Sequence, residues 1–315
     1  MIGVVVPTRN GGARFARCLD GLLRQRPAAD ALVVIDSGSS DGTVQAARRA
    51  GARVLAIAPE DFDHGETRNR AAAELPDADV LVFLVQDAVP LGEGCLAALA
   101  AAATRPGVAA ATARQMPPPE AGPLTASTVE GSPMGASAPR LVGPFRREEL
   151  AALPPERLRG LLLLDDVACA VRGALFRAAG GFPRTGHGED ALLAYDLLAA
   201  GWALAHEPAA LVEHGHAYDS RSVADRYRLD AAFFRERFGC RVRGGPLATL
   251  KGFLAERRRD GRWAQAHAID DRRAFRRASR HLRWAQVRAQ RDGSRGPLGS
   301  APEPRPLPGP QELRA

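Results

Sequence analysis

The amino-terminal part of the chain alternates short apolar runs with helical segments. Five apolar runs rich in Val, Leu and Ile, each bounded by turn residues, occupy residues 2–6, 31–35, 53–57, 80–85 and 108–112. Ala-rich and amphipathic helical patterns separate these runs. This alternation is typical of βαβ units, whose right-handed crossovers place the carboxyl ends of parallel strands at one edge. The sequence therefore predicts an α/β fold with a mostly parallel central sheet and a ligand site at that edge.

The rest of the chain changes character by segment. Residues 115–160 are rich in Pro, Gly and Ser and predict a partly mobile loop that covers a ligand. Further strand signals occur at residues 161–164, 167–171, 203–206 and 209–212. We predict a catalytic domain over residues 1–220, a basic helical extension over 221–291 and a disordered Pro/Gly-rich tail over 292–315.

Composition limits the class of protein without choosing a function. The chain has 315 residues, and no apolar run approaches the roughly 20 residues that span a bilayer. Met1 leads directly into a strand signal, so we expect a cytoplasmic protein. The four cysteines form no CxxC pair, which argues against a zinc site or a disulfide framework. The net charge of +7 is compatible with an anionic membrane, an acidic substrate or nucleic acid.

Asp87 is a single carboxylate that ends an almost wholly apolar run, residues 80–90. A buried parallel strand opens at its carboxyl end into the ligand crevice of such a sheet, where a metal-binding aspartate is expected. A turn aspartate ahead of Pro90 is the alternative interpretation.

Asp36 ends another strand and precedes a Ser/Gly-rich turn that opens a helix. A carboxylate there can accept a hydrogen bond from a ribose hydroxyl or a base N–H. The turn lacks the glycines of a dinucleotide fingerprint and of a P-loop, which disfavours NAD enzymes and phosphotransferases. An ordinary strand-to-helix turn is the alternative.

Seven motifs occur in the order seen in family 2 glycosyltransferases. They occupy residues 4–10, the Asp36 turn, 62–69, 83–88, 180–183, 188–190 and 214–218. The His-Gly-x-x-Arg-Asn and Gln-Asp-Ala versions resemble the rhamnosyltransferase branch, whose donor is dTDP-L-rhamnose. The resemblance covers about residues 2 to 230 and implies a Rossmann-like GT-A fold.

The resemblance also implies which residues bind the nucleotide-sugar donor. The positions that match donor-binding residues of the family are Pro7, Thr8, Asn10, Asp36, Ser37, Arg68 and Gln86. A guanidinium such as that of Arg68 suits phosphate oxygens because it offers two parallel N–H donors. A solvated helix arginine is the alternative for this position.

Asp87 matches the second carboxylate of the family's Asp-x-Asp, which binds Mg or Mn. The chain departs from that pattern, because Val85 stands where the first aspartate usually lies. His216, and less strongly His214, are the candidates for a further metal ligand, since both side chains point the same way on an extended segment. Hydrogen bonding to loop backbone is the alternative role for this histidine pair.

Asp190 matches the family's general base, which takes a proton from the acceptor. Glu189 and Asp166 are candidates for contact with the acceptor or the donor sugar. The alternatives are a helix-capping role for the 189–190 pair and a turn role for residues 165–166.

The carboxy-terminal helices place arginines on recurrent faces beside Phe275 and Trp284. Such faces suit an anionic membrane that carries a lipid-linked acceptor, and a solvated helical face is the alternative. No recognised nucleic-acid module surrounds the basic residues, so nucleic acid is not expected as a partner.

These features together predict an inverting, metal-assisted glycosyltransferase that moves L-rhamnose from dTDP-L-rhamnose. The expected acceptor is a cell-surface polysaccharide or its lipid-linked precursor, reached at the inner membrane face. A sugar-phosphate nucleotidyltransferase and a non-catalytic nucleotide-sugar-binding protein remain the alternatives.

Overall fold

The computed structural model describes residues 1–216 and 219–314. The strands are β1 Ile2–Thr8, β2 Ala31–Asp36, β3 Arg53–Ala56, β4 Val80–Leu84, β5 Val89–Pro90, β6 Val108–Met116, β7 Arg140–Val142, β8 Ala168–Arg172 and β9 Ala203–Glu213. The α-helices are α1 Gly12–Leu23, α2 Thr43–Arg49, α3 His64–Ala72, α4 Cys95–Ala103, α5 Pro123–Glu130, α6 Arg147–Ala151, α7 Pro155–Arg159, α8 Gly173–Ala178, α9 Glu189–Ala199, α10 Ser220–Phe238, α11 Pro246–Ala266 and α12 Arg272–Gly293. Short 3-10 helices are η1 Pro59–Asp61, η2 Pro133–Gly135 and η3 Glu312–Arg314.

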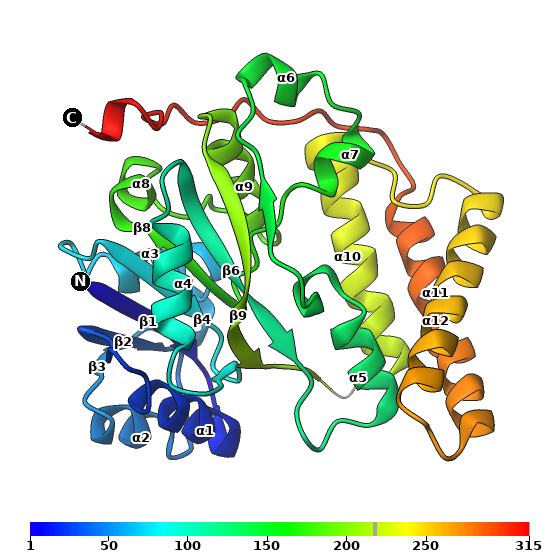
Figure 1. Cartoon of the computed structure of the whole chain (residues 1–315), viewed down its shortest axis with the longest axis horizontal. Helices are drawn as coiled ribbons and strands as arrows, with labels where there is room; N and C mark the ends of the chain where they lie inside the picture. Colours follow the sequence, from blue (N-terminus) through cyan, green and yellow to red (C-terminus); the bar gives the residue numbers. More distant parts are fainter. Residues whose placement is uncertain (217–218, 315) are drawn as a thin grey trace.

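The strands of the described residues form one sheet in the order β3-β2-β1-β4-β8-β6-β9-β5, with β7 paired to β9 (Figure 1). Strands β1, β2, β3, β4, β6 and β9 run in one direction. Strands β5, β7 and β8 run in the opposite direction. The mostly parallel sheet is therefore confirmed, although it is mixed, because an apolar run buried on both faces does not reveal strand direction.

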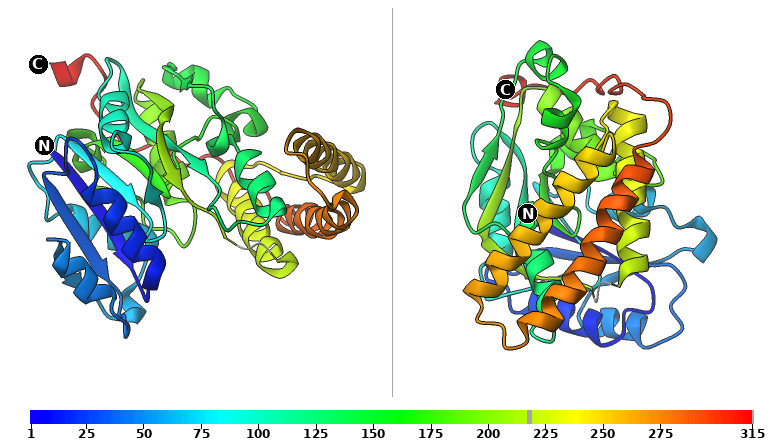
Figure 2. Two further views of the ribbon diagram at one scale, coloured as in Figure 1. Left: turned by 60° about the horizontal axis from the view of Figure 1, so that its bottom comes forward. Right: turned by 90° about the vertical axis from the view of Figure 1, so that its right-hand side faces the viewer.

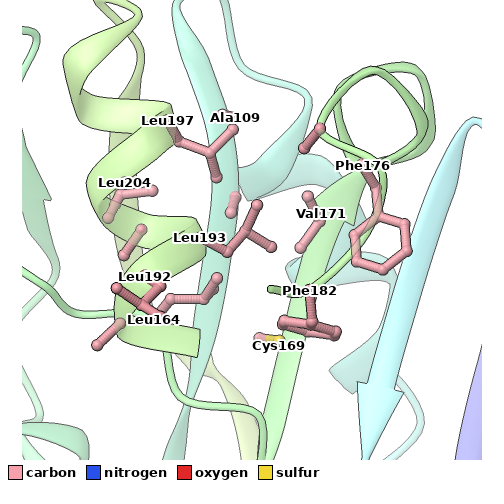
Figure 3. Close-up of a cluster of buried hydrophobic side chains, with 14 of the residues drawn as sticks. Ala109, Leu164, Cys169, Val171, Phe176, Phe182, Leu192, Leu193, Leu197 and Leu204 are labelled. Atoms are coloured by element: carbon pink, nitrogen blue, oxygen red, sulfur yellow. The ribbon is translucent and has the colours of Figure 1, made fainter. Parts of the chain in front are cut away.

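Both faces of the sheet are covered, as β4 illustrates. Val80, Val82 and Leu84 belong to one buried cluster, and Leu81 and Phe83 belong to another. This follows from the two-residue period of a strand. The ring centroid of Phe83 lies 4.9 Å from those of Phe176 and Phe182. Figure 3 shows these two rings beside β8, with leucines of α9 on the other side of that strand.

Two sequence-based element assignments were wrong. Residues 161–164 form no strand; the leucines at 162–164 are buried, but in an irregular segment that leads into β8. The two signals at 203–206 and 209–212 belong to one strand, β9. The predicted loop over 115–160 also contains short elements, among them α5, α6 and α7. Apolar composition predicts burial in these places, and it does not by itself predict backbone pairing.

Described residues of the tail after α12, for which disorder was expected, lie beside the sheet domain (Figure 1). Arg305 Nε donates to Asp196 Oδ2 on α9 at 2.7 Å. Trp202 Nε1 donates to the Pro308 carbonyl at 2.8 Å. A Pro-rich segment lacks helical or strand periodicity, yet such side-chain contacts can hold it in an extended form.

The helices α10, α11 and α12 lie side by side and form the predicted helical extension (Figure 2). A buried ion pair joins α11 to α12, with Arg283 Nε 2.9 Å from Asp260 Oδ2. Ser127 Oγ of α5 donates to Asp260 Oδ1 at 2.9 Å. The extension is thereby attached to the segment after β6. Among the described helices, none combines the length and hydropathy needed to cross a membrane.

Replacing Arg283 by Met should destabilise the protein by about 3–5 kcal/mol, because it leaves the buried Asp260 carboxylate without its partner. Arg280→Met removes an exposed arginine from the same helix and should cost less than about 0.5 kcal/mol. Urea unfolding measures both changes. Equal midpoints for the two variants would contradict the role assigned to this ion pair.

Candidate functional site

The carboxyl ends of β1 and β2 lie side by side at one edge of the sheet, with Thr8 opposite Asp36. Asp36 is buried, and one carboxylate oxygen accepts a hydrogen bond from the Ser39 amide at 2.8 Å. Ser37 Oγ donates to the Thr8 carbonyl at 3.2 Å. Pro7 is buried in β1 immediately before Thr8. The structure thus brings these four predicted donor-binding residues to one edge.

The loop after β1 is held by the side chains of Asn10 and Gln86. Asn10 has a left-handed backbone, with φ 48°, and its Oδ1 accepts from the Ser40 amide at 2.9 Å. Gln86 Oε1 accepts from the Arg9 amide at 2.9 Å, and Gln86 Nε2 donates to the Arg9 carbonyl at 3.2 Å. Both side chains therefore stabilise the loop backbone at this edge of the sheet. Their predicted ligand contacts would come in addition to this role.

The Thr8 hydroxyl is buried at this edge and has no hydrogen-bond partner among the described residues. Buried hydroxyls in proteins are almost always hydrogen-bonded. Asp36 stands opposite Thr8 in the register of the neighbouring strand and adds a carboxylate to this edge. A ligand with both a donor and an acceptor, as nucleobases and ribose have, could satisfy the pair.

Asp87, His214 and His216 form a first cluster. Asp87 follows β4, and the two histidines follow β9. His214 Nε2 lies 3.9 Å from Asp87 Oδ1, and His216 Nδ1 lies 3.7 Å from Asp87 Oδ2. One ligand atom from each of the three residues lies within 4.8 Å of the others. The structure brings this predicted set together; Ala217 and Tyr218 of the same motif lie outside the described residues.

Asp87 also has a cationic neighbour. Arg14 Nη1 lies 3.7 Å from Asp87 Oδ2 and donates to the Gly215 carbonyl at 3.0 Å. Arg14 lies in α1 and is half-exposed. Its position shows that the Asp87 carboxylate is balanced by positive charge even without a metal.

The orientation of His214 is fixed by Gln115, at the end of β6. Gln115 Nε2 donates to Asp165 Oδ2 at 3.0 Å, so Gln115 Oε1 faces His214 Nδ1, at 3.2 Å. Because an amide oxygen only accepts, Nδ1 carries the proton and Nε2 presents its lone pair toward Asp87. Burial lowers the pKa of His214 to about 4. The imidazole is therefore neutral at neutral pH, as a metal ligand must be.

A second cluster gathers carboxylates around Arg68. Arg68 Nη2 lies 2.8 Å from Asp166 Oδ2, and Arg68 Nη1 lies 3.3 Å from Glu189 Oε1. Asp165, Asp166 and Asp190 each offer an oxygen within 4.8 Å of the others. The Arg68 side chain is 2% exposed. The structure thus surrounds Arg68 with acids, whereas the sequence predicted that it faces the donor diphosphate.

These acids have a raised proton affinity. Burial raises the pKa of Asp190 well above its ordinary value, and the charge of Asp166 raises it further. Burial and Asp166 also raise the pKa of Glu189 to about 7. A carboxylate in this state is a stronger base than one in water, which is the property that proton abstraction requires.

Gly188 allows the helix that carries Asp190 to begin at this place. Its φ of 77° is left-handed, and a Cβ built on it would lie 2.4 Å from the Phe233 ring on α10. Only glycine tolerates both conditions. Asp190 Oδ1 accepts from the Ala191 amide at 2.7 Å, so Asp190 also contributes to the first turn of α9.

No sequence pattern predicted Gln115 as a site residue. Its contacts with His214 and Asp165 join residues far apart in the chain, at the ends of β6 and β9 and before β8. Only the pairing of β6 between β8 and β9 reveals that these positions meet.

The chain is similar in sequence to a known family and to named relatives. Residues 3–130 match the family model of Glycosyl transferase family 2. The chain is 33% identical over 228 residues to an O-antigen chain rhamnosyltransferase of Salmonella typhimurium, covering 72% of this chain and 70% of the relative. It is 27% identical over 281 residues to an N-acetylglucosaminyl-diphospho-decaprenol L-rhamnosyltransferase of Mycobacterium tuberculosis, covering 82% and 91% of the two chains.

Among solved structures, the chain resembles a mannosyltransferase from Pyrobaculum calidifontis in complex with GDP-Man and Mn2+. The TM-score is 0.53 at 18% identity, over 91% of this chain and 86% of the other, which supports a GT-A fold. The identity to the Salmonella rhamnosyltransferase over 70% of its length, with the family match, shows that this chain is a glycosyltransferase that belongs to family 2.

Proposed function

We propose that this enzyme transfers L-rhamnose from dTDP-L-rhamnose to a lipid-linked or cell-surface glycan acceptor. The observation that carries the proposal is the juxtaposition of two different clusters through Gln115. The Asp87–His214–His216 set is suited to the donor diphosphate, and the Asp190 set is suited to the acceptor hydroxyl. The rhamnosyltransferase names of the relatives support the choice of sugar.

The Asp87 cluster fits a divalent cation, Mg or Mn. It offers one carboxylate and two imidazoles, and His214 is neutral with Nε2 directed toward Asp87. Two nitrogen donors favour a transition metal such as Mn over Mg. When bound, such an ion neutralises the charge of the leaving diphosphate. The histidines thereby take the place of the first aspartate, which is Val85 in this chain.

Asp190 acts as the general base of a single displacement. The acceptor oxygen attacks the anomeric carbon, the bond from that carbon to the diphosphate breaks, and the acceptor proton passes to Asp190. Arg68 forms ion pairs with Asp166 and Glu189, which lie near Asp190, and one guanidinium cannot neutralise the charge of both. One base is enough, because a single displacement inverts the anomeric carbon with no covalent intermediate.

The proposed site of action is the inner, cytoplasmic membrane face. On α11, Leu247, Leu250 and Leu254 recur at helical spacing and are 66%, 48% and 44% exposed. The exposed basic residues Lys251 and Arg258 lie close to them in sequence. An apolar stripe flanked by cations favours the surface of an anionic bilayer.

A panel of nucleotide sugars tests the function as a whole. With Mn present and no acceptor, we expect slow release of dTDP from dTDP-L-rhamnose, faster than release from UDP- or GDP-sugars. Release of pyrophosphate from a nucleoside triphosphate and a sugar phosphate would instead indicate a nucleotidyltransferase. Donor binding without any turnover, with or without acceptor, would indicate a non-catalytic binding protein.

Asp190→Asn should lower kcat about 10²–10⁴-fold and leave the donor affinity unchanged, because the amide cannot accept the proton. Steady-state kinetics and donor titration measure the two quantities. If the variant retained near-normal turnover, Asp190 would not be the general base.

The same variant should melt about 2–4 °C higher than the wild type at pH 8, with a smaller gain at pH 5. A buried carboxyl with a raised pKa binds its proton more tightly in the folded state, so its stability contribution falls as pH rises through that pKa. Asparagine does not ionise, so the variant lacks this loss of stability at high pH. Asp196→Asn, which breaks the pair with Arg305, should melt lower at both pH values. Thermal scans that show no pH dependence of the difference would contradict the raised pKa.

His214→Gln should weaken the apparent affinity for Mn about 10–100-fold, and Asp87→Ala should abolish turnover. Mn is titrated into chelator-treated protein, with dTDP release and electron paramagnetic resonance of free Mn as readouts. His267→Gln changes an exposed histidine on the helical extension and should behave as the wild type. An unchanged Mn requirement in His214→Gln would exclude His214 as a ligand of the metal.

The double variant Leu250→Asp, Leu254→Asp should lose most binding to vesicles that contain phosphatidylglycerol, while the wild type binds them more than neutral phosphatidylcholine vesicles. Leu141→Asp changes an exposed leucine on β7 and should not affect sedimentation with vesicles. Equal binding of all three proteins would contradict the membrane contact.

A further inference from the structure

Arg14, in the first turn of α1, begins at the edge of the sheet where the nucleoside of the donor is expected. Helix α1 follows β1, which ends at Thr8, and Asp36 ends the neighbouring strand β2. The amide of Gly12 donates to Asp41 Oδ2 at 3.1 Å, which attaches the first turn of α1 to the turn after β2. The backbone of Arg14 is therefore held beside Thr8 and Asp36.

The side chain of Arg14 extends from that edge to the Asp87 cluster. Its Nη1 lies 3.7 Å from Asp87 Oδ2 and donates to the Gly215 carbonyl at 3.0 Å. Gly215 stands between the two histidines of the cluster. His216 Nδ1 also lies 3.7 Å from the same Asp87 oxygen. The guanidinium is therefore beside the atoms proposed to hold the metal.

A nucleotide-sugar donor has its parts in a fixed order: nucleoside, diphosphate, sugar. The contacts proposed for the nucleoside, Thr8 and Asp36, lie at the ends of β1 and β2. The residue proposed to hold the metal that neutralises the diphosphate is Asp87. Arg14 joins these two positions, because its backbone belongs to the first and its side chain reaches the second. A diphosphate that connects them lies beside this guanidinium.

The contacts of Arg14 with carboxylates are too long for hydrogen bonds. Nη1 is 3.7 Å from Asp87 Oδ2, and Nη2 is 3.6 Å from Glu120 Oε1. An N–H···O hydrogen bond spans roughly 2.7–3.2 Å. The Glu120 side chain is 54% exposed, and an ion pair at the surface contributes little. The Arg14 side chain is itself 42% exposed, so a ligand can reach it.

Two other arginines near the clusters are already paired. Arg17, one turn later in α1, donates to the buried carboxylate of Glu213 at 2.7 Å. Arg68 was predicted from sequence to bind the diphosphate, but its side chain is 2% exposed and its Nη2 lies 2.8 Å from Asp166. Of these three arginines, Arg14 is the one that is accessible and has no hydrogen-bonded carboxylate among the described residues.

We propose that Arg14 binds the diphosphate of the nucleotide-sugar donor. The inference rests on the proposed function, and it gives to a residue of α1 the contact that the sequence predicted for Arg68. A guanidinium offers parallel N–H donors that match the oxygens of a phosphate. Asp87 is also the proposed metal ligand, so Arg14 shares this counter-charge with any ion bound there. The diphosphate supplies the further negative charge that the guanidinium needs.

The hydrogen bond to Gly215 gives Arg14 a second role, because it holds the segment that carries the two histidines. A residue with this role alone would affect Mn binding, and it would affect a nucleoside and a nucleoside diphosphate equally. The affinity for dTDP relative to thymidine and the affinity for Mn therefore distinguish the two roles.

Calorimetry on the full chain in metal-free buffer measures the affinities for dTDP, dTMP and thymidine. Electron paramagnetic resonance of free Mn measures the metal affinity without nucleotide. The variants are Arg14→Gln and Arg14→Lys. The matched control is Arg24→Gln, which changes an exposed arginine at the opposite end of α1. Unfolding midpoints verify that each variant folds, and Arg14→Lys gives the same comparison if Arg14→Gln does not fold.

Arg14→Gln should weaken dTDP binding about tenfold, since it loses a charge-assisted contact, and should leave thymidine binding unchanged. Arg14→Lys keeps the charge without the planar guanidinium and should lose part of the dTDP affinity. Without nucleotide, Arg14→Gln should bind Mn no more weakly than the wild type, because it removes a cation from beside Asp87. Arg24→Gln should match the wild type in every measurement.

An unchanged dTDP affinity in Arg14→Gln, or an equal loss of dTDP and thymidine affinity, would overturn the proposal. A wild type that binds dTDP no more tightly than thymidine would also overturn it. If the wild type binds dTDP but neither hydrolyses nor transfers the sugar of any donor, the proposed function is wrong. The comparison of the variants would still decide whether Arg14 contacts the diphosphate.

Discussion

The ion pairs of Arg68 are the interaction on which the arrangement of the site depends. This residue of α3 contacts Asp166, which precedes β8, and Glu189, which begins α9. Four carboxylates gather here, those of Asp165, Asp166, Glu189 and Asp190. They would repel one another strongly at low dielectric without a cation among them. A single guanidinium reduces that repulsion but leaves negative charge in excess, and this excess contributes to the raised pKa of Asp190. The same contacts thus hold three segments together, and they gather around Asp190 the acids that, after burial, raise its pKa.

The Asp87 cluster has histidines in place of a second acid. Val85 contributes no ligand atom, and the two histidines approach Asp87 from the end of β9. Gln115 orients one of them and at the same time contacts Asp165 beside the acid cluster. The Asp87 cluster and the acid cluster therefore share contacts with one amide.

The sequence predicted features that depend on residues close together in the chain, namely strands, helices and motifs. The strands β1 to β4 and β6 were predictable because each is a short apolar run that alternates along the chain with a helical segment. The grouping of Asp87 with His214 and His216 came from motif order, and the antiparallel pairing of β5 with β9, which sets Val89 opposite Glu213, explains it physically. The direction of β8, the acids around Arg68 and the docking of the tail were not predictable. Each depends on contacts between distant segments, for which hydrophobic periodicity carries no information.

The tail links the helical extension to the helix of the acid cluster. It returns from α12 to the sheet domain, where Arg305 pairs with Asp196 on α9, the helix that begins with Glu189 and Asp190. The helical extension is thus joined to the sheet domain at both of its ends. A movement of the extension relative to the sheet would therefore have to break the contact between Arg305 and Asp196 or carry α9 with it.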